Sequence, residues 1–319
     1  MLPPEIEAAL KLRGKKHRQH YVFRRYLKRW ATKDRLAVLR KGEIRESNLT
    51  RVAVEKQFYK LQPITPDDVT LIRTTLLESA NDFVRSNAES LIKCFTLPFV
   101  VRDLIEANPP VNPLLSAWVE EQIVNGEENL HCGVEEGLMG ALDEMLDGKT
   151  DFFLDPRASY EFLYAISVQY LRTKRMREAI GAVRSPFAGS DMTRIRGLYT
   201  LISAMRIADS MYEERARHKL VLLDNQTGIP FITGDQPIIN LHATFGDGAP
   251  ESLEFYYPIS PTRAMVLVNA ATSVEAIVRG DRVSTLNGLM VRNSHDQVFS
   301  NSAAYLESFR GQSLPTGTC

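Results

Sequence analysis

His20 is the residue best suited to proton transfer, because an unperturbed histidine titrates near neutral pH. It stands directly before a run of basic and aromatic residues, and His17 lies three positions earlier. Two histidines at this spacing could share one helix face and one metal ion. We therefore consider three roles for His20: a general acid or base, a metal ligand, or a structural hydrogen-bonding residue.

Two acidic residues could complete such a site. Asp235 lies in the segment TGDQP, residues 233–237, just after an apolar run, where catalytic carboxylates often project from a rigid scaffold. An aspartate in such a turn also commonly accepts backbone hydrogen bonds, which is the structural alternative. Glu55 could pair with Asp235 if their strands share a sheet, and the two carboxylates would then suit a divalent metal such as Mg²⁺. The alternative for Glu55 is an exposed acid at a strand end.

Two groups of cations are candidates for phosphate or nucleic-acid binding. Arginine and lysine clusters hold phosphate oxygens through charge-assisted hydrogen bonds, although an ordinary solvated helix surface has the same composition. Residues 21–30 have apolar side chains at helical spacing, which predicts a short basic amphipathic helix. Its candidates are Arg24, Arg25, Lys28 and Arg29, and those of the stretch 170–177 are Arg172, Lys174 and Arg175.

His131 and Glu135 are a further possible ligand pair, at positions i and i+4 of an expected helix. Gly133 between them weakens that helix. The sequence contains no HExxH, GxSxG, Walker or glycine-rich dinucleotide motif. The usual metalloprotease, serine hydrolase, ATPase and dehydrogenase signatures are therefore missing.

Charge is unevenly distributed along a chain whose net charge is zero. The segment from Lys11 to Lys41 has 13 Lys or Arg against Asp34 alone, whereas Glu120 to Asp151 has ten acids against one lysine. A basic segment raises the local concentration of anions and could attract nucleic acid or nucleotides. The other interpretation is that the two segments pair with each other within the chain.

The composition indicates a soluble protein of the cytosol. Of its 319 residues 44% are hydrophobic, the opening residues lack the order of a secretory signal, and no apolar run approaches the roughly 18 residues of a membrane span. Cys94, Cys132 and Cys319 show no CxxC spacing, so we expect reduced thiols. Neither export nor a membrane partner is expected.

Local patterns predict the main elements. Alternation on both sides of Lys41-Gly42 predicts a tight hairpin, and Pro66 marks the start of a long helical region. A second hairpin loop is expected at residues 224–228. Further strands are expected at 255–259 and 265–268, and a helix at 284–294.

These elements predict an α+β fold. The early hairpin and the late strands would form a mainly antiparallel sheet, with a large helical block inserted between them. The β-rich module would comprise residues 1–60 and 219–319, and the helical insertion residues 61–218.

Several segments together resemble one known family. The resemblance is carried, in order, by His20-Tyr21-Val22, residues 54–59 (VEKQFY), 231–237 (FITGDQP), 257–261 (YPISP) and 287–300. In this order they are similar to the bacterial Domain of Unknown Function 4238 family, whose single domain would span residues 1–319. Phe23 replaces a usual proline, and Gly234 and Gln236 replace the commoner serine and asparagine. The resemblance implies no established activity, although some relatives are associated with anti-phage defence.

We consider two functions and one purely structural interpretation. The first function is a nucleic-acid-directed hydrolase, nuclease or phosphodiesterase-like, in which His20 handles a proton, Asp235 with Glu55 assists catalysis or metal binding, and the cations grip phosphate. The second is a non-catalytic protein whose basic helix binds nucleic acid or another protein. In the structural interpretation, the charged segments serve only to pair with each other.

Overall fold

The structure is a computed structural model that describes residues 14–242 and 252–311. The chain forms two compact units, each assembled from separate segments of the sequence. Unit 1 comprises residues 1–19, 55–134 and 177–206, and unit 2 comprises residues 20–54, 135–176 and 207–319. Three predictions include residues outside the described ranges: the opening residues, the start of the basic segment with Lys11, and Cys319.

One sheet of unit 2 joins the two ends of the sequence, as predicted. Its strand order is β3-β2-β11-β6, and all its pairings are antiparallel. The strands are β2 (Arg35–Arg40), β3 (Glu43–Asn48), β6 (Thr233–Gly234) and β11 (Val298–Ser300). The α+β fold class and the sheet of N- and C-terminal segments are therefore confirmed.

The predicted hairpin at Lys41-Gly42 is the connection between β2 and β3. Arg40 pairs with Glu43, and the two residues between them have φ values of 51° at Lys41 and 74° at Gly42. A two-residue loop with both φ values positive matches the twist of the strands that it joins. The local sequence signal and the observed turn agree.

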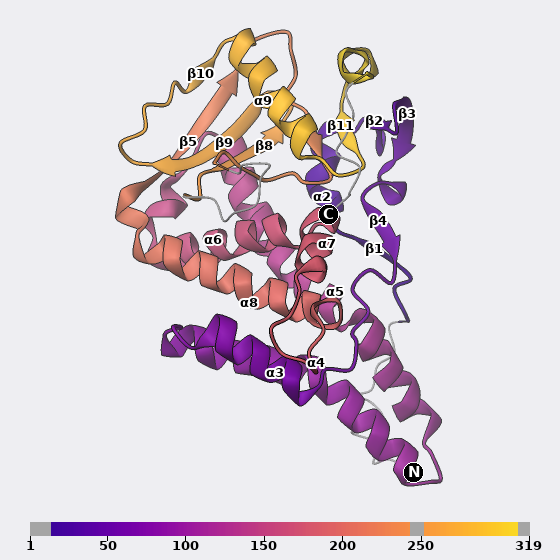
Figure 1. Ribbon diagram of the computed structural model, residues 1–319. Coiled ribbons are helices and arrows are strands. Elements are labelled where there is room, and N and C mark those ends of the chain that lie inside the picture. The colour runs from indigo at the N-terminus through magenta and orange to yellow at the C-terminus, as the bar shows by residue number, and fades with distance from the viewer. Residues whose placement is uncertain (1–13, 243–251, 312–319) are drawn as a thin grey trace. The chain divides into compact units, whose positions relative to one another are not determined.

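Most of the late strands form a second sheet instead of extending the first. Its order is β10-β5-β9-β8-β7, with β10 parallel to β5 and the other pairs antiparallel (Figure 1). The strands are β5 (His218–Asn225), β7 (Ile239–Asn240), β8 (Phe255–Ser260), β9 (Arg263–Asn269) and β10 (Ile277–Val278). The expected strands at 255–259 and 265–268 are confirmed as β8 and β9.

The expected hairpin at residues 224–228 is wrong. β5 pairs with β9 and β10, whereas the next strand, β6, belongs to the other sheet. Asn225 explains the change of direction, because its side chain accepts from the backbone N–H of Thr227 and donates to the carbonyl of Ile229. This asparagine-stabilised turn leads the chain away from β5.

Helices α6 and α9 and several short helices complete unit 2, together with segments of α5, α7 and α8, which continue into unit 1. Helix α9 packs on the second sheet, where Val283, Leu286 and Met290 join a core that includes Val266 and Tyr256 (Figure 1). The helix expected at 284–294 is therefore confirmed. The helices and turns that lie wholly within unit 2 are α2 (Arg24–Leu27), η1 (Lys28–Trp30), η2 (Leu49–Arg51), η4 (Asp151–Leu154), α6 (Pro156–Leu171), η5 (Arg215–Arg217), α9 (Gly280–Asn293), α10 (Ala303–Leu306) and η6 (Glu307–Phe309).

Unit 1 is helical. Its first helix begins where Pro66 predicted, and Thr65 and Asp68 form a reciprocal capping box there. The helices that lie wholly within it are α3 (Pro66–Ile72), the π-helical turn η3 (Arg73–Leu77) and α4 (Asp82–Ala107). Among the described residues, no helix is long and apolar enough to span a membrane.

The division between the units falls inside continuous elements. These are α5 (Pro113–Leu146), α7 (Lys174–Ala182), α8 (Met192–Glu213) and the pair of short strands β1 (Arg18–His20) and β4 (Val54–Lys56). The expected helical region is thus present, and its residues contribute to both units. This discontinuity has no local signature in the sequence.

Candidate functional site

His20 is held by hydrogen bonds within unit 2. Its ring Nε2 donates to the backbone carbonyl of Leu49 at 3.2 Å, and its own carbonyl accepts from Arg172 at 2.6 Å. His20 ends strand β1, so the expectation that it shares a helix face with His17 is wrong. The ring is therefore oriented by the backbone of its own unit.

Asp235 is buried in unit 2 and has both carboxylate oxygens engaged. Oδ1 accepts from the backbone N–H of His295 at 2.7 Å, and Oδ2 from those of Asp296 at 2.8 Å and Gln297 at 3.0 Å. Burial raises the pKa of Asp235 to about 6, although the N–H donors act in the opposite direction. This geometry ties the TGDQP turn to the segment after α9, which is the structural role weighed for this aspartate.

Glu55 belongs to unit 1, whereas His20 and Asp235 belong to unit 2. The predicted Glu55–Asp235 pair is thus divided between the units. His131 and Glu135 are divided in the same way, and His131 instead contacts Glu127, one turn earlier on α5. Within residues 14–242 and 252–311, no cluster of three or more His, Cys, Asp or Glu side chains could hold a metal ion.

The basic helix after His20 presents part of its charge to solvent. Arg24, Arg25 and Lys28 are exposed, whereas Arg29 forms an ion pair with Asp143. Glu135 lies within electrostatic reach of Arg24 and Arg25, and burial raises its pKa. Acids of α5 thus face part of this basic helix inside unit 2.

The second group of predicted cations serves different structural contacts. Arg172 is 1% exposed and its guanidinium lies 4.2 Å from the centre of the Phe23 ring. Arg175 donates to the backbone carbonyl of Asn293 at 2.7 Å, at the end of α9. Lys174 is partly buried. These three side chains stay candidates for phosphate binding, but Arg172 and Arg175 already hold backbone groups.

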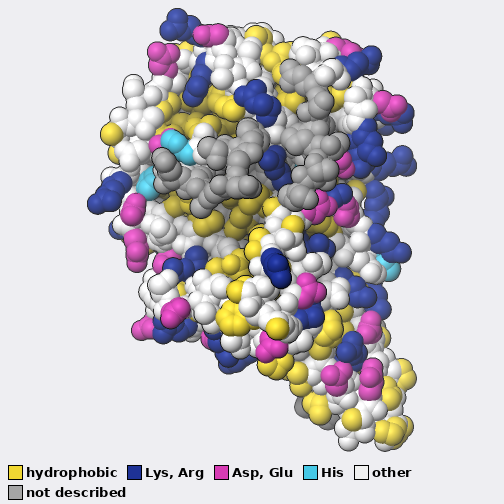
Figure 2. Space-filling model, viewed as in Figure 1, with side chains coloured by type: hydrophobic (Ala, Val, Ile, Leu, Met, Phe, Trp, Pro, Cys, Tyr) yellow, Lys and Arg dark blue, Asp and Glu magenta, His cyan; other side chains and the backbone are white. Residues whose placement is uncertain are grey.

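The remaining basic segment also meets acids inside its own unit. In unit 1, Lys15 pairs with Glu120 at 3.6 Å, and the N–H of Gly14 donates to Glu121. In unit 2, Figure 2 shows Lys and Arg side chains over β2 and β3 with acidic side chains among them. The ion pairs there are Arg35–Glu46, Arg45–Glu43 and Arg40–Asp296.

Unit 1 contains a cavity of about 390 Å³ with a surplus of basic side chains. We call it the arginine cavity. Its charged lining residues are Lys60, Arg177, Arg194 and Arg196 with Glu127 and Asp191. Phe58, Phe95, Gln57 and Gln62 contribute aromatic and amide groups.

A buried ion pair forms one wall of the arginine cavity. Arg177 and Glu127 are both 3% exposed, and Arg177 Nη1 donates to Glu127 Oε1. His131 lies 3.4 Å from the same oxygen, and Gly197 is required beside it because a Cβ there would lie 2.2 Å from Glu127 Oε2. Burial opposes ionisation of Glu127, but Arg177 and His131 outweigh it and keep the pKa of Glu127 below its ordinary value.

Arg196 supplies a second guanidinium at this wall. Burial, and then the charge of Arg177, lower the pKa of Arg196 from its ordinary value. Its side chain makes no hydrogen bond or ion pair within the described part of the chain, and the buried Nε of Arg177 has no hydrogen-bond partner there either. The charges of Glu127, Glu178 and Glu55 act on the pKa of Arg196 in the opposite direction, but none of these acids forms an ion pair with it. An anion could therefore bind to its unused donors.

Arg194 is already neutralised. It makes a two-point contact with Asp68, with Nε–Oδ2 and Nη2–Oδ1 distances of 2.7 and 3.0 Å. Arg194 and other hydrogen bonds outweigh the effect of burial and lower the pKa of Asp68. This pair fixes α8 to the start of α3. Because Arg177 is likewise paired, with Glu127, Arg196 is the arginine of the lining that has no ion pair among the described residues.

Comparison with known families identifies the chain. Residues 18–304 match the model of the family described as Protein of unknown function (DUF4238). The chain belongs to the DUF4238 family. No curated protein and no solved structure matches this DUF4238 chain.

Sequence reasoning missed most of the arginine cavity in this family member. Arg177 lies in the predicted stretch 170–177, but its partner Glu127 is 50 positions away in the sequence. The sequence places Glu127 and His131 at positions i and i+4, which is a possible sign of a contact. The sign is ambiguous, because Glu135 lies four positions after His131 and has the same spacing. Arg196 had no local signal, because only the packing of α8 beside Arg177 distinguishes it.

Proposed function

We propose that the chain is a binding protein for a nucleotide or a similar small phosphate-bearing ligand, held in the arginine cavity. The observation that carries the proposal is the Arg196 guanidinium, which is partly buried beside Arg177 and has no hydrogen-bonding or ion-pair partner among the described residues. Removing a cation from water is costly unless it is paired. A bound anion would supply the missing pair.

Phosphate suits this arrangement better than an uncharged ligand. Arginine donates from a planar fork that matches phosphate oxygens, and such charge-assisted bonds are about twice as strong as neutral ones. Glu127 already pairs with the buried Arg177, so Arg196 is the guanidinium that would hold the phosphate. Lys60, which is exposed at the lining, adds a further positive charge.

The size and lining of the cavity favour a nucleotide over a nucleic-acid strand. Its volume of about 390 Å³ falls in the range of small-molecule sites. The amides of Gln57 and Gln62 can both donate and accept hydrogen bonds, as the edge of a base requires. Much of the basic N-terminal segment, in contrast, faces acids of its own unit.

The test is isothermal titration calorimetry of the full chain with AMP, ADP, ATP and inorganic phosphate. Arg196→Gln should weaken binding about 10- to 100-fold, since hydrogen bonds to charged groups contribute about 1.5–3 kcal/mol. Arg206→Gln is the matched control, because Arg206 lies on the same helix, donates to Ser79 and does not line the cavity. It should leave the affinity within about twofold of the wild type, as expected for a residue with no ligand contact.

The proposal is wrong if none of the four ligands binds at millimolar concentration, or if Arg196→Gln binds as tightly as the wild type. Binding of single-stranded RNA without nucleotide binding would instead favour the exposed cations Arg24, Arg25 and Lys28. The same samples, incubated with and without Mg²⁺, also test for hydrolysis. Hydrolysis through His20 and Asp235 is not part of the proposal, because both oxygens of Asp235 are engaged by backbone N–H groups.

The proposal includes a cytosolic location. Nucleotides are cytosolic ligands, and Cys94 and Cys132 are both free thiols, which suits a reducing compartment. A nucleotide ligand would also fit the association of some relatives with anti-phage defence.

A further inference from the structure

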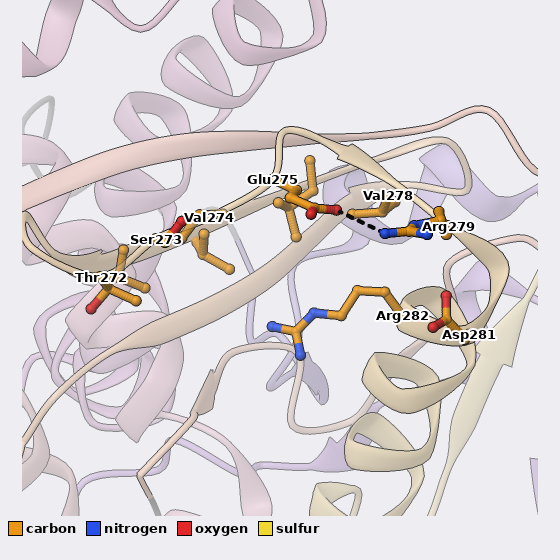
Figure 3. A pocket seen from close by; sticks show the side chains of 11 residues that line it. Thr272, Ser273, Val274, Glu275, Val278, Arg279, Asp281 and Arg282 are labelled. Atoms are coloured by element: carbon orange, nitrogen blue, oxygen red, sulfur yellow. Dashed lines mark ion pairs between the residues drawn. The ribbon is translucent and has the colours of Figure 1, made fainter.

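A second cavity, of about 450 Å³, lies in unit 2 beside the second sheet. Figure 3 shows it between the strands, the connection at residues 272–275 and the first turn of α9. None of its lining residues belongs to the arginine cavity. Any ligand here would therefore be recognised independently of the first site.

The floor of this cavity is made of branched apolar side chains. Leu223 comes from β5, Val266 and Val268 from β9, and Val278 from β10, and each is at most 4% exposed. Val274 from the connecting segment adds to them. Such a floor favours the hydrocarbon part of a ligand, because burying each CH₂ group contributes about 0.8 kcal/mol.

Arg282 brings a positive charge to this apolar floor. In Figure 3 its side chain extends from α9 toward the cavity, while Arg279 points to Glu275 and pairs with it at 4.0 Å. Arg282 has no hydrogen bond or ion pair within the described ranges. Its guanidinium is therefore available for an anionic group.

Tyr256 provides a second polar group on the same face of the sheet. It is paired with Val266 across β8 and β9, is 0% exposed, and its hydroxyl has no hydrogen-bond partner in the described chain. Burial raises the pKa of Tyr256, and the charge of Arg282 acts in the opposite direction, so the two groups lie within electrostatic reach. Tyr256 does not line the cavity, so Arg282 is the group that would meet a ligand's negative charge.

We propose that this cavity binds an aliphatic monocarboxylate, with the carboxylate on Arg282 and the hydrocarbon chain on the valine and leucine floor. A single guanidinium matches a single negative charge. The acids Glu275 and Asp281 line the same cavity and would repel a phosphate dianion. The ligand class therefore differs from that of the arginine cavity.

The test uses the full chain and ligand-observed NMR or calorimetry with octanoate, with hexanoate and decanoate as a length series. Octanoate should bind, and affinity should rise with chain length. Octan-1-ol, which lacks the charge, should bind at least about tenfold more weakly, because it forgoes a charge-assisted hydrogen bond. Arg282→Gln should lose about tenfold or more for octanoate, and its helical signal should stay unchanged because Arg282 is exposed.

Arg279→Gln is the matched control. It removes the same charge from the same rim, but Arg279 already forms an ion pair with Glu275. It should change octanoate affinity by less than about threefold, as a surface pair contributes little. Ser273→Trp, at an exposed lining position, should block entry without altering the core. Arg196→Gln should leave octanoate binding unchanged, which separates this site from the arginine cavity.

Absence of octanoate binding to the wild type overturns the proposal. So does binding that Arg282→Gln and Ser273→Trp leave unchanged, because octanoate would then be held by other apolar surface, such as the exposed side chains Leu97, Val100 and Leu104 on α4.

Discussion

Some single residues in this protein are of types found in catalytic or ligand-binding sites, yet they form hydrogen bonds with the backbone instead. Asp235 was the most plausible catalytic carboxylate in the sequence, and the structure gives each of its oxygens a backbone donor. Arg172 is likewise of a residue type that binds phosphate, but in the structure it donates to a backbone carbonyl and packs on Phe23. Arg196 has the opposite character, since nothing in the sequence marks it and its guanidinium faces a cavity.

Asp235→Asn should destabilise the fold by about 1–3 kcal/mol, because the NH₂ group of asparagine would face backbone N–H groups that now donate to a carboxylate oxygen. The measurement is urea denaturation at neutral pH. Asp281→Asn is the control, because Asp281 is exposed and makes no hydrogen bond or ion pair with its side chain in the described chain. It should change stability by less than about 0.5 kcal/mol. Equal effects of the two substitutions would contradict the role assigned to Asp235.

The same variant has an expected pH signature. The raised pKa means that Asp235 binds its proton more tightly in the folded chain than in the unfolded chain. Its contribution to the free energy of unfolding is therefore present in full below about pH 4 and is lost as the pH rises to about 6. The stability difference between wild type and Asp235→Asn should accordingly be larger at pH 4 than at pH 7.

At the scale of elements, the fold combines one locally encoded turn with helices that tolerate unfavourable residues. Gly42 has a φ of 74°. A Cβ added there would lie 3.9 Å from the Arg310 carbonyl oxygen, an ordinary contact, so the cost of a substitution comes from the backbone conformation. Gly133 lies in the 34-residue helix α5 with open space around it. We therefore expect glycine to stabilise the fold at position 42 and to destabilise it at position 133.

Gly42→Ala should lower the free energy of unfolding by roughly 1–2 kcal/mol, the cost of a left-handed conformation for a residue with a Cβ. Gly133→Ala should raise it by roughly 0.5–1 kcal/mol, because alanine loses less backbone entropy in a helix. Thermal and urea unfolding of both variants measures the signs. Destabilisation by Gly133→Ala would show that the residue has a packing role that the structure does not contain.

Elements defined by neighbouring residues were predictable from the sequence. The Lys41-Gly42 turn, the helix start at Pro66, strands β8 and β9 and helix α9 all depend on local patterns. The wrong hairpin at residues 224–228 shows the limit, because the loop chemistry of Asn225 was visible but the choice of partner for β5 depends on strand β9, about 40 positions later. The arginine cavity depends on the same kind of distant contact, here between α5 and α7.

The whole molecule consists of two units that share helices. Trp118 on α5 belongs to unit 1 and Trp30 in η1 belongs to unit 2, and they are the two tryptophans of the chain. Helices α5, α7 and α8 continue from one unit into the other. Loss of either unit would therefore break helices that also belong to its neighbour.

We expect the two units to unfold together in urea. Trp30→Phe leaves Trp118 to report on unit 1, and Trp118→Phe leaves Trp30 to report on unit 2. Within each variant, tryptophan fluorescence and far-ultraviolet circular dichroism should give coincident transitions, which is the criterion for a two-state process. Separated midpoints within one variant would mean that the shared helices do not couple the units.

The interleaved order of the segments also constrains how the protein is made. The last segment of unit 1 ends at residue 206, so that unit is completely translated before strands β5 to β11 are. The β2–β3 hairpin is translated some 250 residues before its neighbour β11. For most of synthesis the nascent hairpin thus has an open edge on β2, which is a surface of the kind that chaperones protect.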